Sequence, residues 1–125
     1  MNQKNTIFKL LFSFAGRVSR AEFVKGNLIV LLILLFLGGL FAFFGPKIDS
    51  ENFIPQFTMF ALAILIFALI TTTALGVKRS HDLDWSGWLA LLMFLPMIGF
   101  VYSLLLFFKI GTVGPNRFGL DSAQK

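Results

Sequence analysis

Three long stretches of the chain contain no charged residue, and they constrain its fold more than any other feature. They cover residues 26–46, 52–77 and 85–108, which are 21, 26 and 24 residues long. About 20 residues of helix cross the roughly 30 Å hydrocarbon layer of a bilayer. Hydrophobic residues make up 57% of the 125 residues and charged residues only 14%. A soluble chain of this size has no core large enough to bury so much apolar surface. The sequence therefore predicts an all-α integral membrane protein.

The same stretches divide one membrane domain, residues 1–125, into elements. Transmembrane helices are expected at about residues 24–45, 55–77 and 86–108, followed by an ordered, turn-rich tail at 109–121. Near the N-terminus, apolar residues surround Lys4 and Lys9, which predicts a short amphipathic helix at about residues 5–15, lying on the membrane surface. The first apolar stretch is too long for a signal-peptide core and no cleavage pattern follows it, so we expect it to be retained.

Local signals predict some helix boundaries and contacts. Ser19 and Glu22 have the spacing of a capping box, which predicts a helix that begins at Arg20 and runs to about residue 44. Pro55 suits the first turn of the next helix. The three threonines at 71–73 are expected to donate to carbonyls one turn earlier instead of lining a pore.

The third apolar stretch allows two arrangements because it contains Pro96 and Gly99. It forms either one span kinked at Pro96, or two half-helices that turn back between these residues as a re-entrant hairpin. A proline is tolerated in a membrane helix where neighbouring groups satisfy the freed carbonyl. Because 24 residues correspond to one crossing, we favour the kinked span and keep the hairpin as the alternative.

Lys and Arg residues near the spans indicate the orientation in the membrane. The segment before the first span carries five, the first connection carries one and the second connection carries two. This distribution predicts that the N-terminus and the loop at 78–86 face the cytoplasm. The tail carries three more, which lie outside with three full spans and inside with a hairpin, so its side stays open.

The second connection concentrates polar chemistry, because five ionisable side chains lie between Lys78 and Asp84, including the only His. A charge in the bilayer centre costs about 3 kcal/mol, so these groups belong at the interface or in a cavity. One His and two carboxylates fall short of a catalytic zinc site. No Ser or Cys with a matched base is found. We therefore expect no metal, no cofactor and no enzymatic activity.

A structural interpretation explains more of this loop. Lys78 and Arg79 anchor the end of the second helix and complement its dipole. Asp82 or Asp84 then caps the next helix at its N-terminus. The two tryptophans at positions 85 and 88 fit an interfacial aromatic belt.

Three motifs follow one another between the apolar stretches. They are Gly16-Arg17-Val18-Ser19-Arg20-Ala21-Glu22-Phe23, then Arg79-Ser80-His81-Asp82 with Ser86-Gly87-Trp88, and Gly111-Thr112-Val113-Gly114-Pro115-Asn116-Arg117-Phe118-Gly119. In this order they resemble one family, the YhaH-like bacterial inner-membrane proteins, catalogued as domain of unknown function 805. The chain departs from the family pattern at Val24, Ser80, Leu89 and Ser122. The resemblance implies a bacterial inner-membrane location and supplies no activity, because the family has none assigned.

A hairpin in the third stretch would gather the motif residues at one cytoplasmic site. Such a basic pocket would suit a phospholipid headgroup, another anion or a protein partner. The candidate binding residues are Arg17, Arg20, Arg79, His81, Asp82, Asn116 and Arg117. The motif positions expected to be structural are Ser19, Glu22, Ser86, Gly87, Trp88, Gly111, Gly114, Phe118 and Gly119.

The leading functional hypothesis is a non-catalytic membrane protein that associates with anionic lipids, with copies of itself or with another membrane protein. An oligomeric transporter or channel subunit is the alternative, although the three apolar stretches lack the ionisable residues that mark ion paths. An interfacial enzyme using His81 and Asp82 is a third. Nucleic-acid binding is not expected, because no basic helix stands clear of the membrane.

Overall fold

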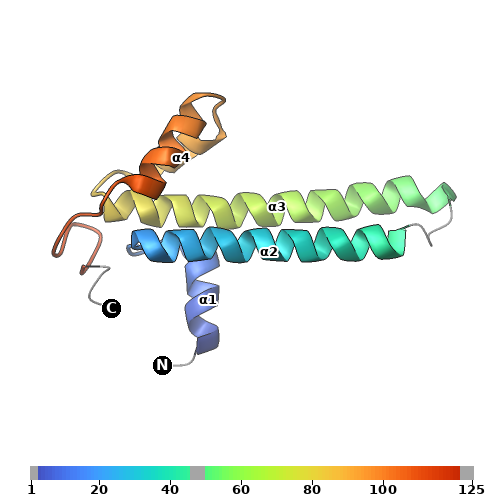
Figure 1. Ribbon diagram of the computed structural model, residues 1–125, viewed down its shortest axis with the longest axis horizontal. Helices are drawn as coiled ribbons and strands as arrows, with labels where there is room; N and C mark the ends of the chain where they lie inside the picture. Colours follow the sequence, from blue (N-terminus) through green and yellow to red (C-terminus); the bar gives the residue numbers. More distant parts are fainter. Residues whose placement is uncertain (1–2, 46–49, 122–125) are drawn as a thin grey trace.

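The computed structural model describes residues 3–45 and 50–121, and it is helical (Figure 1). Within these residues the only bridge of β type joins Asn116 to Gly119 and lies outside any strand. The predicted all-α fold is therefore confirmed. The helices are α1 (Gln3–Phe12), α2 (Arg20–Phe44), α3 (Ser50–Asp82), the 3₁₀ helix η2 (Gly87–Phe94) and α4 (Ile98–Phe108).

The helices α2 and α3 run side by side as a long pair, and α1 projects from one side of it (Figure 1). The predicted capping box is present at the start of α2: the Glu22 amide donates to Ser19 Oγ at 3.3 Å, and the Ser19 amide donates to the Glu22 carboxylate at 3.0 Å. The helix α1 ends at Phe12, earlier than the predicted residue 15. Its last turn is held by Lys78 of α3, whose Nζ donates to the carbonyl of Lys9 at 2.9 Å.

The helix α3 is longer than the predicted 55–77. It begins at Ser50, so Pro55 lies inside the helix and not in its first turn. Its missing N–H leaves the carbonyl of residue 51, in the first turn, without its usual partner within the helix. As predicted, the hydroxyls of Thr71 and Thr73 donate to carbonyls four residues earlier, at 2.8 and 2.6 Å. The polar connection expected before this helix falls partly on residues 46–49, which lie outside the described residues.

The second connection is not a loop where it was expected to be one. Residues 78–82 continue α3 as regular helix, and only Leu83 to Ser86 are non-helical. The charged side chains stay helical because each has a partner. The pair Arg79 and Asp82, three residues apart, forms an ion pair on one face of the helix.

The third apolar stretch folds as a hairpin of two short helices, which is the geometry of the alternative and not of the favoured kinked helix. The chain reverses after η2 and returns as α4 beside it. Beyond α4, the amide of Thr112 donates to the carbonyl of Asp82 at 2.8 Å. Lys109 Nζ lies 4.3 Å from the centre of the Trp85 ring. Both ends of the hairpin therefore meet the same end of α3. The stretch forms two short helices instead of one kinked helix because the tail that follows it finds its hydrogen-bond partners at this end of α3.

The buried core lies at this end of the α2–α3 pair, where α1, α2, α3 and α4 meet. Elsewhere the pair is turned outward: only 6% of the apolar window of α2 and 22% of that of α3 is buried. Both helices are long and apolar enough to cross a membrane, whereas α4 is shorter. A soluble protein rarely exposes so large an apolar surface. The core cluster comprises Leu11, Val18, Phe23, Val30, Leu75, Leu83, Tyr102 and Leu106.

Candidate functional site

A buried ion triad lies at the end of α3, with Asp82 between two arginines. Arg17, from the connection before α2, places Nη2 3.1 Å from Asp82 Oδ1. Arg79, one turn earlier on α3, places Nη1 on Asp82 Oδ2. The three side chains are 0–2% exposed. Removing charges from water is costly, so such a group persists only when hydrogen bonds satisfy the remaining donors.

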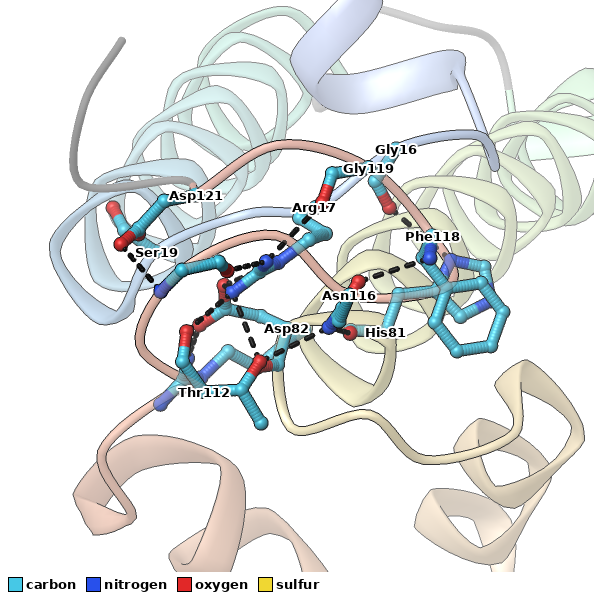
Figure 2. Close-up of polar contacts among 12 residues, drawn as sticks. Gly16, Arg17, Ser19, His81, Asp82, Thr112, Asn116, Phe118, Gly119 and Asp121 are labelled. Atoms are coloured by element: carbon cyan, nitrogen blue, oxygen red, sulfur yellow. Dashed lines mark hydrogen bonds and ion pairs between the residues drawn. The ribbon is translucent and has the colours of Figure 1, made fainter.

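Backbone carbonyls of the C-terminal part satisfy the arginines. Arg17 donates to the carbonyls of Thr112 at 2.6 Å, Gly114 at 2.7 Å and Gly119 at 3.3 Å, as Figure 2 shows in part. Arg79 Nε donates to the carbonyl of Leu106 at 2.9 Å, at the end of α4. A guanidinium has five N–H donors in a fixed plane, which suits several carbonyls at once. Residues far apart in the sequence are thereby joined around two side chains.

The tail also caps α3. The last carbonyls of a helix have no partner within the helix. Here the amide and hydroxyl of Thr112 donate to the carbonyl of Asp82 at 2.8 and 3.0 Å. Asn116 Nδ2 donates to the carbonyl of His81 at 2.8 Å (Figure 2). The tail residues 109–121 therefore satisfy the last carbonyls of α3, as the capping box satisfies amides at the start of α2.

The tail's own turns explain its motif residues. The amide of Phe118 donates to Asn116 Oδ1 at 2.9 Å, and the amide of Gly114 donates to Asp121 Oδ2 at 2.9 Å. Gly114 and Gly119 have φ of +81° and +139°, a region that L side chains rarely adopt. Gly111 lies against the Asp82 carboxylate, where a Cβ atom would overlap it. These glycines let the backbone approach the triad.

His81 makes separate contacts. Its Nδ1 lies 3.1 Å from the Gly16 carbonyl, and its ring stacks on Phe118 with centroids 3.9 Å apart and planes at 7°. A carbonyl only accepts, so Nδ1 carries the proton. His81 lies beyond the apolar residues 53–77, and its burial lowers its pKa from the ordinary value of a histidine, which favours the neutral ring. The Asp82 carboxylate is held by the two arginines.

Other predicted residues lie on the surface of this end. Arg20 is exposed, with Nη1 3.4 Å from the carbonyl of Phe108. Arg117 pairs with Asp84 at 3.2 Å, and their side chains are 61% and 47% exposed. The predicted capping role of Asp82 or Asp84 is wrong, because the N-cap of η2 is Ser86 and its side chain makes no capping bond. Asp82 is held in the triad instead. Of the two tryptophans, Trp85 stacks on Tyr102, whereas Trp88 is 80% exposed.

The structure thus brings five of the seven candidate binding residues into one cluster, with Arg20 and Arg117 at its surface. Sequence reasoning missed Thr112 as its centre and the contact between Ser80 and Tyr102, whose hydroxyl oxygens are 2.6 Å apart. A signal for the second was available: Tyr102 is the only tyrosine of the chain, and a buried tyrosine hydroxyl usually needs a partner.

The cluster is internally satisfied. Among the described residues, every buried side-chain nitrogen and oxygen has a hydrogen-bond partner, and no three metal-ligating side chains group together. The arginines, the aspartate and Asn116 hold the fold together through these contacts. Among the described charged side chains of this end, one exposed residue is acidic, Asp84, and five are basic, namely Lys9, Arg20, Lys25, Lys109 and Arg117.

These features define a small helical protein with two helices suited to crossing a membrane and one saturated polar cluster at their shared end. The family model for "Protein of unknown function (DUF805)" matches residues 11–120, so the chain belongs to that family. The chain is 31% identical to the inner membrane protein YhaI of Escherichia coli K12 over 116 residues, covering 93% of this chain and 91% of YhaI. It is 32% identical to the inner membrane protein YhaH of the same strain, over 92% of this chain and 91% of YhaH. No solved structure matches significantly.

Proposed function

We propose that this protein resides in a bacterial inner membrane, has no catalytic activity, and acts by associating with lipid or with a membrane partner. The names of YhaI and YhaH support the location. The observation that carries the role is the saturated triad: Arg17, Arg79 and Asp82 are held by contacts within the chain, and five of the six exposed charged side chains described at this end are basic. Basic side chains at a membrane surface attract anionic lipids.

The proposed topology has two crossings, α2 and α3, and a hairpin of η2 and α4 that enters and leaves on one side. The end that carries the triad faces the cytoplasm, with α1 on the membrane surface. Support comes from the distribution of basic residues, because none lies in residues 26–44 or 53–77 and the positive-inside rule places the basic end in the cytoplasm. The basic side chains described at this end are Lys9, Arg17, Arg20, Lys25, Lys78, Arg79, Lys109 and Arg117.

Purification in a mild detergent followed by native mass spectrometry tests the role. We expect the protein to retain phospholipid, a second copy or a partner subunit. The double variant Arg20→Gln, Lys25→Gln removes two exposed cations outside the triad. It should retain anionic lipid about thirtyfold more weakly, since each of the two surface cations contributes roughly 1 kcal/mol. A bare monomer that retains neither lipid nor protein would contradict the proposal.

A further inference from the structure

A groove of about 450 Å³ lies on the same end of the molecule, outside the triad. We call it the His81 groove. Its walls come from α3, η2, the connection after α1 and the tail, and most of them are apolar. The residues used below are Phe14, Val77, His81, Trp88, Leu91 and Phe118.

One polar atom, Nε2 of His81, is set in these apolar walls. Because Nδ1 faces the Gly16 carbonyl at 3.1 Å, the proton sits on Nδ1 and Nε2 is left as an acceptor. No hydrogen bond joins Nε2 to another of the described residues. Gly87 stands beside it, and a Cβ there would lie 2.8 Å from Nε2. The glycine therefore keeps the acceptor open to the groove.

One cation lies beside the groove's polar side. The guanidinium of Arg117 lies 4.8 Å from the Phe118 ring, which lines the groove, and is 61% exposed as it pairs with Asp84. The groove thus combines an apolar channel, an open acceptor and one neighbouring guanidinium.

We propose that the His81 groove holds one phospholipid with an anionic, hydroxyl-bearing headgroup, of the phosphatidylglycerol kind. An acyl chain lies against Phe14, Val77 and Leu91. A headgroup hydroxyl donates to His81 Nε2, and the phosphate lies toward Arg117. Trp88, which is 80% exposed, lies at the headgroup level, where tryptophan is favoured.

The headgroup choice follows from charge. An ethanolamine headgroup is neutral overall and brings an ammonium beside Arg117. A choline headgroup has no N–H or O–H to give to Nε2. Phosphatidylglycerol supplies both a net negative charge and hydroxyl donors. This inference rests on the proposed association with lipid and specifies its site and ligand class.

The test uses the full chain in micelles with equal amounts of phosphatidylglycerol, phosphatidylethanolamine and phosphatidylcholine, read by native mass spectrometry. Wild type should retain one phosphatidylglycerol in preference to the others. Leu91→Trp fills the groove and should weaken retention about tenfold. Leu62→Trp is the matched control, because Leu62 and Leu91 are both 49% exposed. Leu62 lies on α3 and does not line the groove. It should retain lipid as wild type does.

A second variant tests the acceptor. His81→Asn keeps an N–H near the Gly16 carbonyl and removes Nε2, so the preference for phosphatidylglycerol over phosphatidylcholine should weaken to the part that Arg117 supplies. Thermal unfolding of each variant checks that the fold persists. If wild type retains all headgroups equally or favours phosphatidylethanolamine, or if Leu91→Trp retains lipid as wild type does, the inference is overturned. If the protein still binds lipid at another site in those cases, the proposed function stands. If wild type retains neither lipid nor a protein partner, the proposed function and the inference about the groove are both overturned.

Discussion

At the scale of single residues, Asp82 is the anion that the two buried arginines share. Its carboxylate serves Arg17 and Arg79, and its carbonyl serves Thr112. Two cations share one anion, so the triad carries a net positive charge in a buried place. The carbonyl dipoles of the tail and of α4 compensate for that charge, which is why the tail is needed for the ion pairs to persist.

Replacing Asp82 by Asn should destabilise the protein strongly. The substitution leaves two buried guanidinium groups without their counter-charge, and breaking a buried pair in this way costs about 3–5 kcal/mol. Thermal or denaturant unfolding in detergent measures the loss.

The matched control is Asp84→Asn, which removes a carboxylate two residues away. Its pair with Arg117 is half exposed, and exposed pairs contribute about 0–1 kcal/mol. Equal effects of the two variants would show that the triad does not hold the fold.

At the scale of elements, the tail is the structural complement of α3. It has no helix or strand of its own, yet it binds the final carbonyls of α3 and surrounds Arg17. The close approach depends on Gly111, which has no side chain to strike the Asp82 carboxylate. The hairpin is joined to the same helix by the Ser80–Tyr102 contact and by Arg79.

Gly111→Ala should release the tail from α3 without unfolding the α2–α3 pair. The added methyl group overlaps the Asp82 carboxylate, and overpacking of this kind typically costs about 1–3 kcal/mol. Hydrogen exchange read by mass spectrometry should show faster exchange in residues 109–121, where the Thr112 amide donates to Asp82.

Gly39→Ala provides the control, because a Cβ at Gly39 meets nothing within 4 Å. It should leave exchange in the tail unchanged. If Gly111→Ala also leaves it unchanged, the close packing of Gly111 on Asp82 does not secure the tail.

At the scale of the whole molecule, the two ends of the α2–α3 pair differ. The helices α1, η2 and α4 and the tail gather at one end, and the other end consists of the pair alone (Figure 1). All the basic side chains that the structure describes lie at the crowded end. A membrane protein with this shape is wider in one leaflet than in the other.

The proposed topology predicts that the tail and the N-terminus share a side. A cysteine introduced at Val113, which is 92% exposed, should react with a membrane-impermeant maleimide only from the cytoplasmic face. The chain has no native cysteine, so each label reports one position.

A cysteine at Phe44, the last residue of α2 and 54% exposed, should react from the opposite face. Labelling of Val113→Cys from the periplasmic face would contradict the hairpin topology and restore the single kinked span.

Much of the fold follows from local sequence signals. The start of α2 at Arg20 was predictable because Ser19 and Glu22 act within one turn. The two long apolar helices were predictable because long uncharged stretches must find an apolar environment. The helical conformation of residues 78–82 was not predictable, because these charged residues stay helical through partners that come from α1, α4 and the tail.

By itself the sequence determined the family, the helical class and the two long apolar helices, because hydropathy, caps and motifs act over a few residues. Only the tertiary structure decided between a kinked span and a hairpin, since that choice depends on where the tail finds hydrogen bonds. The same holds for the motif residues. Their types were visible in the chain, but whether an arginine faces a ligand or a buried aspartate depends on contacts between residues as far apart as Arg17 and Gly119.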